Sequence, residues 1–379
     1  MSLKSTLKAA VGAVAMGGAL ATGAAVNDAN AERIRWKMPI AFPSTLPALA
    51  SPSHYVKDQL EAASGGDVQI RIFEPGKLVG ALEILQAVSD GKVSAGYTWA
   101  GYDIGKVPAI PLFAATPFGM KPWAFIAWYY YGPGHDLVQE VYQNKGFNVH
   151  AQLCGIIGPE TAGWYRSPLN GIADFKGMKI RYAGLGGKVL QELGASVTMI
   201  PGDKLYQNLE TGALDATEFS LPVIDQKLGF NEIVKNNYFP GWHQTFTAQY
   251  MLINGDAWDK ATEQQKALIE TTCTAATTRA LAESEYKNGK VLAEFQDKGV
   301  KARQIPDSML QELRATTKEV LQEEAEKDED FARVWKSQKE FMHYYKIWDK
   351  RAYMQPEMYY SQDPESGMDD DSGMGDGDN

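Results

Sequence analysis

Short strand-like runs alternate with single amphipathic helical patterns between residues 34 and 200. The runs with strand character are 34–41, 68–73, 95–99, 149–153, 179–181 and 197–200. The helical patterns include 46–63, 81–89 and 188–193. Parallel strands cannot be joined by a tight turn and need a crossover, which is usually a helix. The alternation therefore predicts an α/β fold built from parallel βαβ units.

The pattern changes from about Glu263 onward, where long charged amphipathic runs follow one another. Apolar positions recur there with the period of a helix at 263–298, 307–326 and 329–349. We expect these helices to form a C-terminal layer that wraps the body or makes an oligomer contact.

The N-terminus has the features of an export signal. Lys4 and Lys8 precede a run of small and apolar residues from Ala9 to Ala25, and 29–31 supplies an Ala-x-Ala cleavage pattern. We expect residues 1–31 to act as a Sec-type signal peptide that is cleaved after Ala31, which places the mature protein in the periplasm. No cysteine lies near the cleavage site, so we expect no lipid anchor.

Acidic residues dominate the charge of the chain. The formal net charge is −10, and seven of the Asp and Glu residues fall within 362–379, which contains no Lys or Arg. Such a composition argues against nucleic acid as a partner. We expect the acidic tail, 359–379, to be disordered because it cannot bury a core.

Cys154 and Cys273 are the only cysteines. In an oxidising compartment they could form a disulfide, but two buried thiols fit the sequence equally well. Cys154 also lies four residues from His150, and we interpret that spacing as chance rather than as a nucleophile and its base. The chain contains no nucleophile elbow, P-loop or zinc-ligand spacing.

The most informative segment for function is 168–181, a linker that runs into a strand ending on Arg181. A glycine-rich segment follows at 182–187, and we predict a helix from about Lys188. A guanidinium at a strand end beside a glycine-rich turn is well placed to bind a carboxylate with two parallel hydrogen bonds. The alternative is an ordinary strand-to-helix connection with a surface arginine.

Glu160, Glu218 and Gln244 lie in expected loops among aromatic residues. Each alone is explained as a solvated loop residue, but together with Arg181 they suggest a cleft at the strand ends. Such a cleft would hold a hard cation through oxygen ligands and an anion through the arginine. Several aromatic side chains would exclude water from it, although large aromatics are more often plain core: Trp99, Tyr102, Trp164, Phe219 and Trp242.

Four segments give the chain a family resemblance over about residues 32–355. They are FEPGKLVG (73–80), QAVSDG (86–91), DFKGMKIR (174–181) and LETGALDATE (209–218). With these the chain resembles the DctP-type periplasmic substrate-binding proteins of TRAP transporters. The segments 216–219, 227–230 and 238–242 are similar to the branch that binds 2-oxo or 2-hydroxy acids with a metal ion.

The resemblance implies a two-lobed periplasmic binding protein fold that closes on its ligand, with TRAP membrane permease subunits as partners. It implies lobe I at 32–155 plus about 250–290 and lobe II at 156–249. The helices at 291–358 would pack on both lobes or on a partner subunit. In the second case two copies of the chain could form a homodimer through these helices.

The resemblance also implies roles for individual residues. Arg181 would clamp the substrate carboxylate, and Glu160 would touch substrate and in some members the cation. Glu218, the carbonyl of Phe219 and Gln244 would bind Na⁺ or Ca²⁺, a choice that oxygen ligands favour over transition metals. Pocket-wall positions fall on Phe42 and Tyr102.

One departure concerns positions 160 and 244. That branch usually has Gln at 160 and Glu at 244, and in this chain the two residue types are exchanged. The exchange preserves two carboxylates near the cation.

Two other classes of function fit parts of the sequence. An exported lyase or hydrolase could use Glu160 and Glu218 as acid and base, but no other residue supplies a nucleophile or a leaving-group acid. An adhesion or scaffold module is suggested only by the helical end and the acidic tail. We therefore expect a binding protein and not an enzyme.

Overall fold

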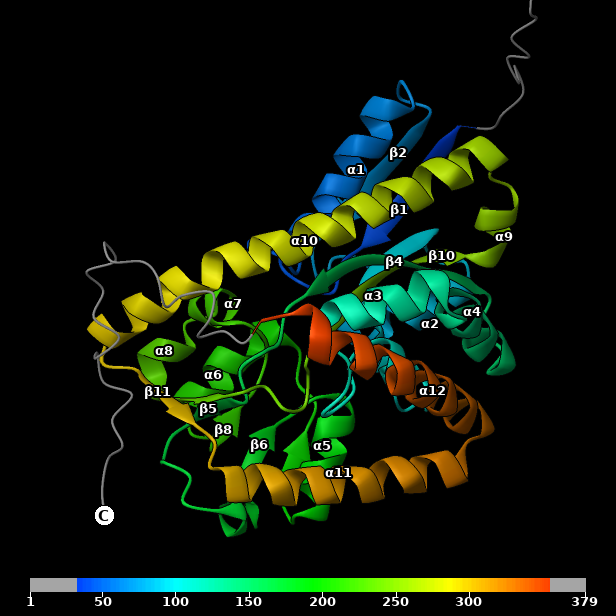
Figure 1. The fold of residues 1–379 in the computed structure, drawn as a ribbon. Helices are drawn as coiled ribbons and strands as arrows, with labels where there is room; N and C mark the ends of the chain where they lie inside the picture. The colour runs from blue at the N-terminus through cyan, green and yellow to red at the C-terminus, as the bar shows by residue number, and fades with distance from the viewer. Residues whose placement is uncertain (1–32, 355–379) are drawn as a thin grey trace, which may run out of the picture. The chain divides into compact units, whose positions relative to one another are not determined.

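The structure, a computed structural model, describes residues 33–354. The expected signal peptide and acidic tail lie outside the described residues. Two groups of strands, with helices packed against them, make up the described part (Figure 1).

The first group of strands combines a parallel pair with an antiparallel sheet. Its members are β1 (Ile34–Pro39), β2 (Val68–Phe73), β3 (Ala95–Trp99), β4 (Val149–Ile157) and β10 (Thr247–Asn254). β1 and β2 are parallel, whereas β10 pairs antiparallel with both β3 and β4. A parallel bridge between Ile40 and Tyr97 connects the pair to the sheet.

The second group is one sheet with the strand order β11-β9-β5-β8-β6-β7. Its strands are β5 (Gly163–Tyr165), β6 (Lys179–Arg181), β7 (Ser196–Thr198), β8 (Ala216–Thr217), β9 (Asn236–Phe239) and β11 (Lys301–Gln304). β6 is parallel to β7 and β8, and β5 is antiparallel to β8 and β9. The connections after β6 and β8 open onto the site described below.

Helices cover both groups of strands. The first eight are α1 (Ser51–Ala63), α2 (Ile84–Ser89), α3 (Pro122–Tyr131), α4 (Gly134–Asn144), α5 (Gly184–Glu192), α6 (Leu205–Glu210), α7 (Pro222–Lys227) and α8 (Phe230–Ile233). The last four are α9 (Gly255–Asp259), α10 (Glu263–Asp297), α11 (Asp307–Lys327) and α12 (Glu329–Ala352).

α10 runs alongside elements of both strand groups (Figure 1). Along its length it packs against α1, β4, α7 and β11. Its start is set by a capping box, in which the side chains of Thr262 and Gln265 each accept a hydrogen bond from the backbone N–H of the other residue. α11 packs against α5, and α12 packs against α3 and α4.

The structure confirms the three long helical runs and corrects several local expectations. The strands at 34–41 and 149–153 are observed as β1 and β4, the latter extending to Ile157. The expected parallel units are present only in part, because β10 brings the chain back from the second sheet and pairs antiparallel. The helix expected over 46–63 begins at Ser51, since the preceding residues form turns.

The glycine-rich segment after Arg181 is a helix start and not an open turn. α5 begins at Gly184, four residues before the expected position. A Cβ on Gly186 would lie 2.6 Å from that of His243, and one on Gly187 would lie 2.7 Å from the carbonyl oxygen of Tyr182. These glycines therefore permit close packing of the first helical turn.

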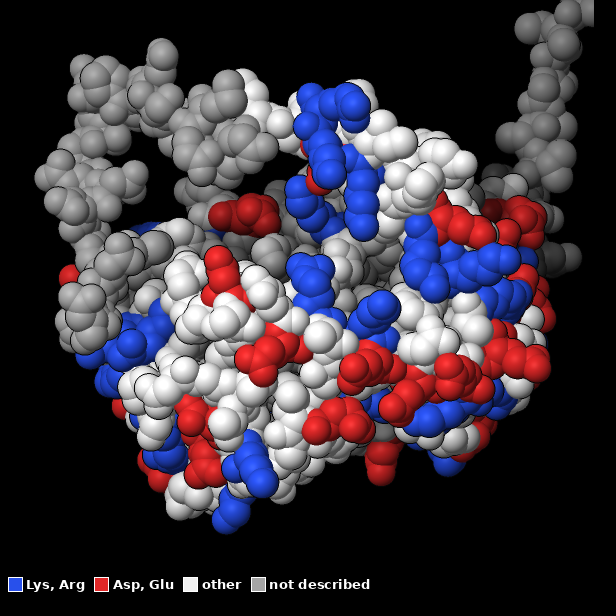
Figure 2. Space-filling model, turned by 60° about the horizontal axis from the view of Figure 1, so that its bottom comes forward, with Lys and Arg blue, Asp and Glu red and all other residues white. Residues whose placement is uncertain are grey.

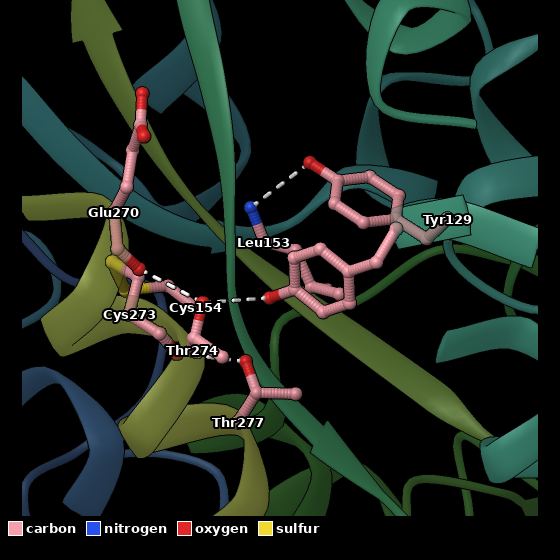
Figure 3. Close-up of a disulfide and its surroundings, with 8 residues drawn as sticks. Tyr129, Leu153, Cys154, Glu270, Cys273, Thr274 and Thr277 are labelled. Carbon is pink, nitrogen blue, oxygen red and sulfur yellow. Dashed lines mark hydrogen bonds between the residues drawn. A yellow bond between two sulfur atoms is a disulfide. The ribbon is translucent and has the colours of Figure 1, made fainter. Parts of the chain in front are cut away.

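Cys154 and Cys273 form a disulfide, which decides between the two states that the sequence left open (Figure 3). The bond joins β4 to α10 across a sequence separation of 119 residues. Cys154 stands where the register between β4 and β10 shifts, so it is the extra residue of a β-bulge. One residue earlier in β4, the amide of Leu153 donates a hydrogen bond to the Tyr129 hydroxyl at 3.3 Å.

Acidic and basic side chains are interspersed on the face shown in Figure 2, without one large field of either sign. Among residues 33–354, no helix is both long and apolar enough to span a membrane.

Candidate functional site

The seven site residues expected from the sequence all line one small pocket. They are Phe42, Tyr102, Glu160, Arg181, Glu218, Phe219 and Gln244, and the lining also includes Leu49, Trp99, Ala183 and Thr247. Most of them stand at strand ends or in the connections between strands. The cavity volume is only about 10 Å³, room for about one water molecule, so the side chains close tightly around the centre of the site.

Arg181 ends β6 and is almost fully buried, with 1% of its surface exposed. Its Nη1 donates to the carbonyl oxygen of Glu218 at 2.8 Å and to the carboxylate Oε1 at 2.7 Å, and Nε donates to the carbonyl of Ile200 at 3.2 Å. Nη2 lies 3.9 Å from the sulfur of Met199, the weakest of these contacts. Two nitrogens of the guanidinium are thus already held by protein oxygens, which leaves Nη2 for a ligand.

Glu218 follows the short strand β8 and forms the ion pair with Arg181. Its Oε1 also accepts the backbone N–H of Ala183 at the start of α5. Burial alone would raise the pKa of Glu218, but the Arg181 guanidinium and the neighbouring His243 outweigh it and hold the pKa below its usual value. The second oxygen, Oε2, is buried and has no hydrogen-bond partner.

Glu160 and Gln244 are neighbours, since the amide of Glu160 donates to the carbonyl of Gln244 at 3.1 Å. Both side chains meet Thr247, whose hydroxyl donates to Glu160 Oε1 at 2.6 Å and accepts from Gln244 Nε2 at 3.1 Å. Burial, and then the charge of Glu218, raise the pKa of Glu160 well above its usual value. Glu160 Oε2 and Gln244 Oε1 are buried without a hydrogen-bond partner.

Sequence reasoning missed His243, which lies behind the two carboxylates. Its Nε2 is 3.8 Å from Glu160 Oε2 and 3.7 Å from Glu218 Oε2, and the three residues could share a metal ion. The ring packs 4.6 Å from that of Tyr182. The only sequence signal is its position beside Gln244, because its partners lie far away in the chain.

The aromatic residues expected around the cleft divide into two groups. Trp99, Tyr102 and Phe219 line the pocket. Trp164 instead donates to Asp225 at 2.8 Å, and Trp242 stacks on Tyr182. These two tryptophans therefore belong to the packing around the pocket and not to its wall.

The chemistry of the pocket is that of binding. Three unpartnered oxygens, from Glu160, Glu218 and Gln244, face a pocket that also holds a buried arginine. Unsatisfied buried acceptors are costly unless a ligand or ion satisfies them. A two-lobed α/β fold with such a pocket defines the class of solute-binding proteins.

Comparison with known proteins gives the family. Residues 50–328 match the model of the bacterial extracellular solute-binding proteins, family 7, and the chain belongs to that family. The monocarboxylate 2-oxoacid-binding periplasmic protein of Nostoc sp. strain PCC 7120 is 31% identical over 322 residues, which cover 85% of this chain and 88% of that protein.

Solved structures agree on the fold. One of them is a TRAP transporter solute-binding protein from Bordetella bronchiseptica RB50, a dimer with copurified calcium and picolinate in one active site. It superposes with a TM-score of 0.82 at 29% identity, and the match covers 84% of this chain and 94% of that one. A TRAP periplasmic protein from Pseudoalteromonas atlantica T6c, with bound sodium and pyruvate, gives 0.81 at 29% identity over 87% and 99%. The chain thus has the TRAP solute-binding fold that the sequence predicted.

Proposed function

We propose that this protein is the extracytoplasmic solute receptor of a TRAP transporter, and that it binds a small 2-oxo or 2-hydroxy monocarboxylate of the pyruvate or lactate type. The observation that carries the proposal is the set of unpartnered buried oxygens of Glu160, Glu218 and Gln244 beside Arg181. The names of the similar proteins, which bind 2-oxoacids or pyruvate, support the same ligand class.

Within this proposal Arg181 binds the substrate carboxylate through Nη2. Glu218, the carbonyl of Phe219 and Gln244 hold a Na⁺ or Ca²⁺ ion, to which Glu160 also contributes. The fit of this donor set rests on its chemistry, because carboxylate and amide oxygens are the ligands that hard cations prefer. A bound cation would supply positive charge for the substrate oxygens. Phe42 and Tyr102 form part of the pocket wall.

The exchange of Glu160 and Gln244 relative to the 2-oxo acid branch is consistent with this site. Both side chains contact the same hydroxyl, that of Thr247, so a carboxylate and a carboxamide occupy adjacent positions. Exchanging them moves one negative charge over a short distance and keeps the number of oxygen ligands.

Family members work outside the cytoplasm with TRAP permeases and are not enzymes, so the lyase or hydrolase alternative is unsupported. For this chain we propose Sec-type export with cleavage after Ala31. We also propose the lobe boundaries expected from the sequence, with 291–358 packing on both lobes or on a second copy.

A homodimer through the C-terminal helices is part of the proposal. The end of α12 exposes Tyr344, Ile347 and Trp348, with 72%, 53% and 62% of their surfaces accessible. Their spacing places them on one side of the helix. One of the similar structures is a dimer.

The test is a titration of metal-free protein with pyruvate, in the presence and absence of Ca²⁺ or Na⁺. If one cation bridges substrate and protein, each ligand must strengthen the other by the same factor. Calorimetry should therefore show weak binding without cation and tighter binding with it. Binding of pyruvate that is unaffected by chelator would exclude the cation, and absence of any binding would exclude the ligand class.

A further inference from the structure

The connection between β1 and α1 contributes a pocket residue that has no assigned role. Leu49 lines the pocket and is buried, with 2% of its surface exposed. The other apolar lining residues are aromatic, apart from Ala183. Leu49 is therefore the one branched aliphatic side chain among the residues that line this pocket.

The pocket has a polar and an apolar part. The charged and amide groups of Glu160, Arg181, Glu218 and Gln244 bind the oxygens of an oxo acid in the proposed function, so its carbon chain must turn toward the apolar part. There Trp99 is fixed by a hydrogen bond to the carbonyl of Ala114 at 3.4 Å and by edge contact with Tyr102 at 5.1 Å. The side chain of Leu49 is a hydrocarbon and forms no hydrogen bonds, so it influences the ligand only through the volume that it takes from the pocket.

The backbone that carries Leu49 is held in an uncommon conformation. Ala48 has a φ of 59°, in the left-handed region that residues with a side chain rarely adopt. Such a conformation persists where the surroundings over-determine it. Here the amide of Ala48 donates to Ser51 Oγ at 3.0 Å and to Glu283 Oε2 at 3.1 Å. Glu283 belongs to α10, so the long helix holds the residue next to Leu49.

Further contacts make this anchor rigid. The hydroxyl of Ser51 donates to the same Glu283 oxygen at 2.5 Å, and Lys287 pairs with the other oxygen. At the other end of the connection, the amide of Ser44 donates to Glu74 at 3.1 Å. The segment 44–51 is thus attached at both ends, which fixes the place of Leu49 in the wall.

We propose that Leu49 sets the length limit for the carbon chain of the substrate, and that Glu283 is the positioning residue that holds Leu49 in place. This inference rests on the proposed function, because it concerns the side chain of the same 2-oxo acid.

The primary test measures the affinities of pyruvate, 2-oxobutanoate and 2-oxopentanoate for wild type and for Leu49→Ala by calorimetry. Each methylene accommodated in an apolar pocket changes affinity by roughly tenfold or more. We expect Leu49→Ala to shift the affinity ratio of 2-oxopentanoate to pyruvate upward by about tenfold or more. Leu49→Phe should shift the ratio in the opposite direction.

A matched control is Leu46→Ala. Leu46 belongs to the same connection and is equally buried, but it does not line the pocket. We expect this variant to lower the melting temperature and to leave the affinity ratio unchanged. If Leu49→Ala does not fold, Leu49→Val provides a smaller truncation at the same site, with a smaller shift in the same direction.

The positioning role is tested with Glu283→Ala, against Glu285→Ala on the exposed side of the same helical turn. Loss of the anchor should raise the ratio for the longer acid, whereas the control should not. A ratio in Leu49→Ala within about twofold of wild type would overturn the inference about chain length, while wild-type binding of pyruvate would still support the proposed function. Absence of oxo-acid binding by wild type would overturn the proposed function itself.

Discussion

Arg181 and Glu218 neutralise each other in a pocket from which water is largely excluded. A substrate carboxylate would bring a further negative charge next to the Glu218 carboxylate. Burying an unpaired charge is costly, which gives a physical reason for a cation in the same pocket. Binding of the substrate should therefore be coupled to binding of the cation.

We expect Arg181→Ala to weaken oxo-acid binding by roughly 2–5 kcal/mol, at least ~30-fold, because the substrate charge loses its partner in a buried site. Arg181→Lys should recover only part of the lost affinity. Its single ammonium group cannot replace the contacts of Nε and Nη1 to protein oxygens and also reach the ligand. Calorimetry measures both variants. Wild-type affinity in Arg181→Ala would place the carboxylate site elsewhere.

The exchanged pair gives a second prediction at this scale. Glu160→Gln and Gln244→Glu should each weaken cation-dependent pyruvate binding, because one removes a carboxylate and the other adds a like charge. The double variant restores the number of carboxylates around Thr247 and should bind better than the two single effects predict, since contacting residues are not additive. A thermal-shift titration with Ca²⁺ and pyruvate measures this coupling, and strict additivity would contradict it.

At the scale of elements, the segment after Arg181 shows how packing chooses between two interpretations of the same residues. The three glycines within 184–187 fit an open ligand-binding turn as well as a tightly packed helix start. The structure shows the helix start. His243 and Tyr182 approach Gly186 and Gly187 so closely that a Cβ at either position would clash, and glycine therefore allows this packing.

The disulfide acts on the same scale because it ties β4 to α10. We expect the double variant Cys154→Ser/Cys273→Ser to lose roughly 2–5 kcal/mol of unfolding free energy, because closing a long loop restricts the unfolded chain. Denaturant unfolding measures the loss. As a control, wild type unfolded and refolded with a reductant should match the variant, and equal stability of oxidised wild type and variant would contradict the expectation.

Two buried carboxyl groups outside the pocket wall affect the stability of the whole molecule. Burial raises the pKa of Asp103 and that of Asp225 to about 7 each, although Lys106 and Trp164 respectively lower it in part. The ordinary value for Asp is about 3.9. Between these values the folded state binds more protons than the unfolded state, so the free energy of unfolding falls as pH rises.

We therefore expect the ligand-free protein to melt at a higher temperature near pH ~5.5 than near pH ~8. The lowered pKa of Glu218 makes the free energy of unfolding rise with pH, but only below this interval. Burial lowers the pKa of His150 to about 4, so this one group opposes the two aspartates up to its unfolded value near 6.5. Asp103→Asn should flatten the dependence, whereas Asp58→Asn, at an exposed side chain, should not. Calorimetric melting as a function of pH measures the slope, and a melting temperature that rises with pH would contradict the sign.

The sequence determined the features that depend on local order. The period of apolar residues predicted α10, α11 and α12 closely, and the motif ending at Arg181 indicated both a strand end and the family. Strand direction around β10 was not predictable in this way, because pairing depends on where the chain returns and not on its local pattern.

Only the tertiary structure decided which distant side chains share the pocket and what surrounds them. It placed His243 beside Glu160 and Glu218, paired Cys154 with Cys273, and put Leu49 in the pocket lining. The resemblance named seven pocket residues but not the ion pair between Arg181 and Glu218. Periodicity and motifs encode the elements, whereas burial, charge pairing and the contacts between residues far apart in sequence arise when those elements pack.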